Sequence, residues 1–102
     1  LNKFTQKAQE AILSAQQIAQ DLNHQAIEPA HLLLALLQQP DGVAPAIITR
    51  VAGSTIALRE ELRQELENRP KVYGASQEVG LSRPAANVLS AAERYARVIQ
   101  GR

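Results

Sequence analysis

The 102-residue chain has no cysteine, methionine or tryptophan, and its only aromatic side chains are Phe4, Tyr73 and Tyr95. Without cysteine it can form no disulfide, no thiolate metal site and no cysteine nucleophile, which fits a reducing compartment. The longest apolar run, residues 32–37, is far shorter than the roughly 20 residues of a membrane-spanning helix. No apolar signal segment opens the sequence. We therefore expect a cytoplasmic protein that does not bind membranes.

The chain also has no excess of charge of one sign, because it contains 11 basic and 10 acidic residues. This balance argues against disorder and against a basic nucleic-acid arm. The turn Ala52-Gly53-Ser54 suggests a helix-turn-helix, but residues 54–68 carry two arginines and four glutamates, a net charge of −2 that would repel phosphate. Residues 69–102 carry a net charge of +4 (six basic, two acidic), without a series of aromatic residues to stack on bases. We expect no nucleic-acid partner.

Alanine and leucine, the best helix formers, dominate the apolar residues and predict an all-α fold. The segment after Pro29, residues 30–39, holds five leucines in six positions and should be the buried central helix. Gly53 is placed to end the next helix in a left-handed conformation, and residues 71–80 are expected to form an exposed loop. Caps and prolines predict five helices, which begin after Thr5, at Pro29, near Pro45, after Ser54 and after Ser82.

No pattern of catalytic or nucleotide-binding residues is present. The glycines are scattered and form no phosphate-binding loop, and the serines have no recognisable base partner. His24 and His31 lack an evident third ligand, so we expect no metal site. His31 is instead expected to be packed, with a hydrogen bond near the start of its helix. The glutamates of residues 60–67 are expected to form a solvated face, with Arg63 and Glu67 paired.

Two helices of the sequence align when the chain is displaced by 77 residues. They are either generic amphipathic helices or the first helices of two repeat units, the second of which is incomplete. In the latter case residues 1–70 form the first unit, 71–80 a loop and 81–102 the start of the second unit. The displacement places Phe4-Thr5 on Leu81-Ser82, Ala8 on Ala85, Ile12 on Leu89, Ala15 on Ala92 and Ala19 on Ala96.

The segments Phe4-Thr5-Gln6-Lys7-Ala8 and Ile27-Glu28-Pro29-Ala30-His31, with the leucine run that follows, resemble the Clp N-terminal repeat domain of AAA+ unfoldases. Within that family, Arg69-Pro70-Lys71-Val72 and the glycine-containing loop before Leu81-Ser82 are most similar to the disaggregating chaperones of the ClpB group. The resemblance implies an all-α pseudo-twofold repeat of four-helix units. It also implies that ATP and Mg²⁺ are bound by other modules of a homohexameric parent protein, and that this domain itself holds no cofactor and is not an enzyme.

The resemblance further implies a protein-binding function. In the family, the first helices of the two units flank a groove that is thought to receive unfolded or aggregated client proteins. The positions that match the family's client-handling residues are Thr5, Ala91 and Tyr95. Thr5 is equally well explained as a plain N-cap, and Tyr95 as a core residue. Two alternatives stay open: an adaptor-binding N-terminal domain of a ClpC- or ClpA-like protease ATPase subunit, and a free-standing helical scaffold or DNA-associated protein.

Overall fold

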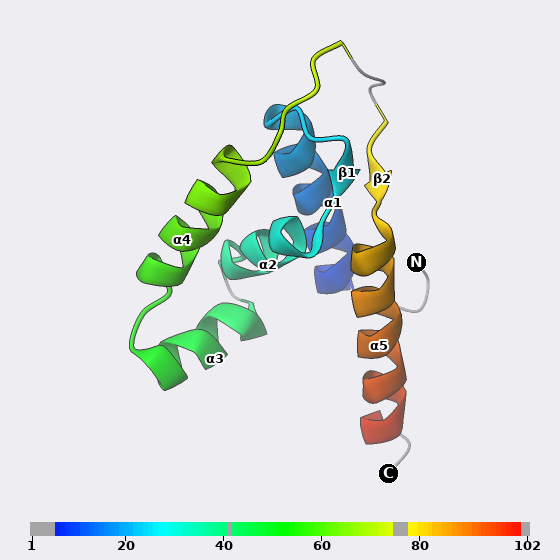
Figure 1. Ribbon diagram of the computed structural model, residues 1–102. Helices are drawn as coiled ribbons and strands as arrows, with labels where there is room; N and C mark the ends of the chain where they lie inside the picture. The colour runs from blue at the N-terminus through cyan, green and yellow to red at the C-terminus, as the bar shows by residue number, and fades with distance from the viewer. Residues whose placement is uncertain (1–5, 41, 75–77, 101–102) are drawn as a thin grey trace.

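A computed structural model describes residues 6–40, 42–74 and 78–100 (Figure 1). Helices account for most of this part of the chain, which confirms the all-α prediction. Thr5, which we expected to cap the first helix, lies outside the described residues. The elements in chain order are α1 (Gln6–Asp21), β1 (Ala26–Ile27), α2 (Pro29–Leu37), α3 (Val43–Ala52), α4 (Ile56–Glu67), β2 (Gly80–Leu81) and α5 (Arg83–Gln100).

Helix α2 is the central element, as its leucine content predicted. It contacts α1, α3, α4 and α5. On one side Leu32 and Ala35 pack into a cluster with the small buried residues of α1, where alanine lets the two helices approach closely. On another side Leu34 and Leu37 meet the buried leucines of α4. The described core therefore consists of two apolar clusters that share α2.

The capping predictions were correct at two helices and wrong by one residue at a third. Gly53 has a φ of +85° and ends α3 in the left-handed conformation, and the Ser82 hydroxyl accepts a hydrogen bond from the Ala85 amide (3.1 Å). The N-cap of α4 is Thr55 rather than Ser54. The Ser54 hydroxyl nevertheless accepts a hydrogen bond from the Ile56 amide (3.0 Å), because a serine side chain can reach the backbone amide two residues later.

A short parallel pairing of β1 with β2 was not predicted. Ala26 lies opposite Gly80 and Ile27 opposite Leu81, and the Ser82 amide donates to the Ile27 carbonyl (3.0 Å). Our prediction that residues 71–80 are an exposed loop is therefore wrong at its end, where Val79 is buried. Two residues are too few for an alternating pattern, so this pairing depends on where tertiary packing places the two segments. It fixes the start of α5 beside the start of α2.

Candidate protein-binding surface

Helix α5 is covered at its beginning and uncovered further along. Ala85 is fully buried and Leu89 partly buried, both against the cluster built by α1 and α2. Ala92 is exposed, and Val88 and Tyr95 are 49% and 70% exposed. Figure 1 shows the helix running away from the other elements toward the C-terminus. Between Val88 and Tyr95, α5 therefore presents apolar side chains to solvent.

The two aligned helices differ in how far their apolar stripes are covered. On α1, Ile12 and Ala15 are buried within the cluster that includes α2 residues. The aligned positions on α5 are Leu89, which is partly buried, and Ala92, which is exposed. The two stripes thus differ in burial at these aligned positions, although Ala85 at the start of α5 is as buried as the core residues of α1. A repeat relationship between them stays a prediction, since burial alone does not test it.

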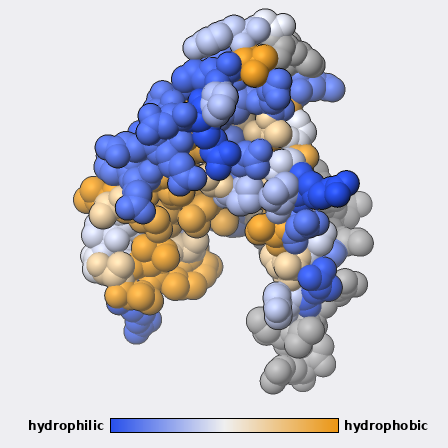
Figure 2. Space-filling model, viewed as in Figure 1, coloured by the Kyte–Doolittle hydropathy of each residue, from blue (hydrophilic) through white to orange (hydrophobic). Residues whose placement is uncertain are grey.

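Helix α3 carries a second apolar surface that sequence reasoning did not single out. Val43, Ile47 and Val51 are spaced four residues apart, so they share one face, and all three are more than half exposed. No residue of α3 is buried. Figure 2 shows apolar surface gathered over α3, on one side of a hollow whose other side is α5. The spacing was visible in the sequence, but it is equally typical of a core-facing helix.

The structure describes two of the three predicted client-binding residues. Tyr95 is 70% exposed, so its alternative placement in the core is wrong. Ala91 lies one turn before Tyr95 on the same face and is partly buried. Thr5 falls outside the described residues. Contact of Ala91 and Tyr95 with a client stays a prediction.

His24 and His31 are brought together, although they are separated by the end of α1 and the start of α2. Both are buried, and Nδ1 of His24 lies 2.8 Å from Nε2 of His31. The Glu28 amide donates to Nδ1 of His31 (2.8 Å), which confirms the expected hydrogen bond near the helix start. Burial lowers the pKa of His31 to about 4 and also lowers the pKa of His24. Over the described part of the chain, no three side chains of the metal-binding types lie close enough together to hold an ion.

The glutamates of α4 form a solvated face, as expected. Those at positions 60, 61, 65 and 67 are all exposed. Glu67 pairs with Lys71 (3.2 Å) instead of the predicted Arg63, and Glu65 pairs with Arg69 (3.5 Å). Both pairs link the last turns of α4 to the segment that follows it. Exposed pairs of this kind contribute little to stability, about 0–1 kcal/mol each.

Comparison with known proteins decides the family. Residues 3–101 match the model of the Clp repeat (R) N-terminal domain. The chain belongs to this family. It is 38% identical, over 94% of its length, to the chaperone protein ClpB of Pseudomonas putida. It is 41% identical to that of Bacillus cereus over 78%, and 37% identical to chaperone protein ClpB 1 of Synechococcus elongatus over 92%.

The chain spans only a small part of these relatives. It covers 11% of the Pseudomonas putida protein, 9% of the Bacillus cereus protein and 11% of the Synechococcus elongatus protein. The family assignment agrees with the resemblance carried by the segments around Phe4 and Ile27. Among the described helices, none is both long and apolar enough to cross a membrane.

Proposed function

We propose that this chain is the client-binding N-terminal domain of a ClpB-like, ATP-dependent disaggregating chaperone. Its task is to hold exposed apolar segments of unfolded or aggregated proteins. ATP and Mg²⁺ would act elsewhere in a homohexameric, cytoplasmic parent, and this domain would bind protein without catalysing a reaction. Family membership and the similarity to ClpB proteins support the assignment.

The observation that carries the proposal is the uncovered apolar side of α5. Val88 and Tyr95 expose large side chains on a helix whose first turn is anchored in the core by Ala85. A tyrosine offers a broad apolar ring and one polar group, a combination that is common at recognition surfaces. An anchored helix holds that ring in place, which reduces the entropy lost when a client binds.

The apolar character of the surface suits clients of unrelated sequence. Apolar contact is non-directional and requires few obligatory hydrogen bonds, so it tolerates many sequences. The exposed stripe of α3 across the hollow from α5 would extend the same kind of surface. Weak binding by each copy is sufficient, because several copies in one hexamer raise the effective concentration.

A pair of tyrosine variants tests the proposal. Tyr95 and Tyr73 are exposed to nearly the same extent, 70% and 73%, but Tyr73 lies between α4 and β2. The measurement is fluorescence titration of the 102-residue chain with a labelled, reduced and carboxymethylated lactalbumin, which is permanently unfolded. Loss of an aromatic anchor costs about 1 kcal/mol or more, so Tyr95→Ala should weaken binding at least about fivefold. Tyr73→Ala should bind as the parent chain does.

Circular dichroism on both variants provides the control, because an exposed tyrosine contributes little to folding and the thermal midpoints should agree within a few degrees. Equal affinity of Tyr95→Ala and the unchanged chain would remove Tyr95 from the site. Failure of the unchanged chain to bind the unfolded protein, together with binding of a Clp protease adaptor, would support the adaptor-binding alternative instead.

A further inference from the structure

The hydrogen bonds around the two buried histidines determine which ring nitrogens carry protons. Nδ1 of His31 accepts a hydrogen bond from the Glu28 amide, so it has no proton. The neutral ring of His31 must then carry its proton on Nε2, which lies 2.8 Å from Nδ1 of His24 and donates to it. His24 must therefore carry its own proton on Nε2. The result is a series of hydrogen bonds, all donated in one direction, from the Glu28 amide to His31 and from His31 to His24.

The last donor of this series is Nε2–H of His24, which is buried without a hydrogen-bond partner at full geometry. Burial lowers the pKa of His24, and a hydrogen bond with the backbone of Leu66, at the end of α4, raises it by less. The Leu66 carbonyl also accepts the Arg69 amide (3.2 Å). The pair thus lies between the turn after α1 and the start of α2, which are close in sequence, and the end of α4, which is distant from both.

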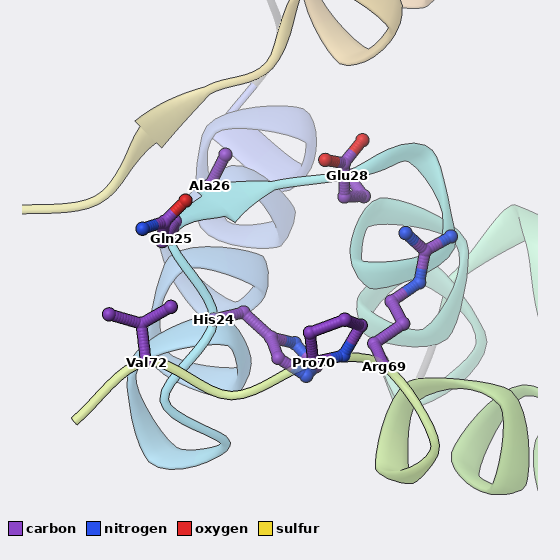
Figure 3. A pocket seen from close by; sticks show the side chains of 7 residues that line it. All are labelled: His24, Gln25, Ala26, Glu28, Arg69, Pro70 and Val72. Atoms are coloured by element: carbon purple, nitrogen blue, oxygen red, sulfur yellow. The ribbon is translucent and has the colours of Figure 1, made fainter.

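The segment after α4 lines a cavity together with His24. Figure 3 shows Val72 and Gln25 toward one end of this cavity and Arg69 toward the other, with Pro70 between Val72 and Arg69. The cavity has a volume of about 250 Å³ and separates the turn before β1 from residues 69–72. One backbone hydrogen bond, from the Val72 amide to the Asn23 carbonyl (2.8 Å), joins the two sides.

A proton added to this pair would have no acceptor. On Nδ1 of His31 it would face the Glu28 amide, and on Nδ1 of His24 it would face the Nε2–H of His31, so either position sets two N–H groups against each other. The charged groups that face His24 are Lys71, Arg69 and Glu67, and those that face His31 are Arg69 and Glu28. Of the carboxylates, Glu67 is paired with Lys71 and Glu28 takes part in the capping box of α2.

We propose that the His24–His31 pair is an acid-sensitive latch that holds residues 69–72 against the turn before β1. Uptake of one proton from solvent breaks the hydrogen bond between Nε2 of His31 and Nδ1 of His24. The two rings then turn apart, and residues 69–72 are released. Their release breaks the hydrogen bond from the Val72 amide to the Asn23 carbonyl. The latch is independent of client binding at α5, which uses other residues.

Nuclear magnetic resonance tests the latch in the 102-residue chain. Long-range ¹H–¹⁵N spectra near neutral pH should show both imidazoles protonated on Nε2. Amide exchange of Val72, divided by the exchange rate of an unstructured peptide at the same pH, should accelerate at least about tenfold between about pH 7.5 and about pH 5. A ring protonated on Nδ1, or a pair that titrates at or above the ordinary histidine pKa of about 6.5, would overturn the proposal.

Two variants sharpen the test. Replacing both rings (His24→Asn with His31→Gln) removes the titrating groups while keeping polar side chains, and should abolish the acceleration at Val72. Gln64→His adds an exposed histidine on α4 and should leave the acid response of Val72 unchanged. An undiminished response in the double variant would refute the latch. Where the double variant fails to fold, the ring spectra of the unchanged chain still decide.

Discussion

Truncation of Leu66 tests how α4 is held in the molecule. Leu66 is fully buried and packs with Leu34 and Leu37 of α2 and with Leu62 of its own helix. Leu66→Ala removes this packing and leaves a cavity, for which leucine-to-alanine changes cost about 2–5 kcal/mol. We expect about 2–3 kcal/mol, because α4 packs mainly on α2 and can move inward to fill part of the space.

A loss of this size is a large fraction of the roughly 5–15 kcal/mol that stabilise a typical domain. It should lower the thermal midpoint by roughly 10–20 °C, at roughly 4–8 °C per kcal/mol for a chain of this size. The assay is urea unfolding followed by circular dichroism, in which the midpoint falls and the slope stays constant.

Ile56→Ala is the matched control for Leu66→Ala, because Ile56 lies on the same helix and is 64% exposed. It should cost less than about 0.5 kcal/mol, as expected for a surface change. A loss below about 1 kcal/mol in Leu66→Ala would refute the packing of α4 described above. So would equal losses in the two variants.

Two further changes test the rest of the core. Burial lowers the pKa of His31 from 6.5 to about 4, so the folded state favours the neutral ring. The free energy of unfolding should therefore be highest above pH 6.5 and should fall by about 3 kcal/mol as the pH decreases toward 4. Urea titrations at a series of pH values check this, and a free energy of unfolding that does not fall with acid would contradict it. Ala15→Leu should cost about 1–3 kcal/mol by overpacking, because Ala15 is fully buried among α1 and α2 residues. Ala46→Leu, at an exposed position of α3, should change the urea midpoint little, and equal midpoints for the two leucine variants would show that α1 and α2 are not closely packed.

Much of the local structure was predictable because its causes are local. The end of α3 follows from Gly53, which can adopt a positive φ, and the start of α5 follows from the hydroxyl of Ser82. The leucines of α2 required burial on several sides, so its central place could be inferred before any partner was known. The Ser54 prediction missed by one residue because serine and threonine stand together there, and either hydroxyl can serve near a helix start.

The candidate site was only partly predictable. Residues matching the family directed attention to Ala91 and Tyr95, but whether Tyr95 is buried depends on what packs against α5. The apolar stripe of α3 has the spacing of a core-facing helix, and its exposure follows from the small part of α3 that α2 covers. Periodicity reports that a helix has an apolar face. It does not report whether another element covers that face.

The helices, most of their ends and the family follow from the residues alone, because helix propensity, capping and the motifs around Phe4 and Ile27 are read from neighbouring residues. The contact between His24 and His31, the pairing of β1 with β2 and the exposure of Tyr95 follow instead from how the elements pack together. Each of these depends on segments far apart in the chain, or on the turn after α1, where Asn23 adopts a φ of +60° and redirects the backbone. Burial and hydrogen bonding between distant segments are set by the sum of all packing contacts, and no single stretch of residues encodes that sum.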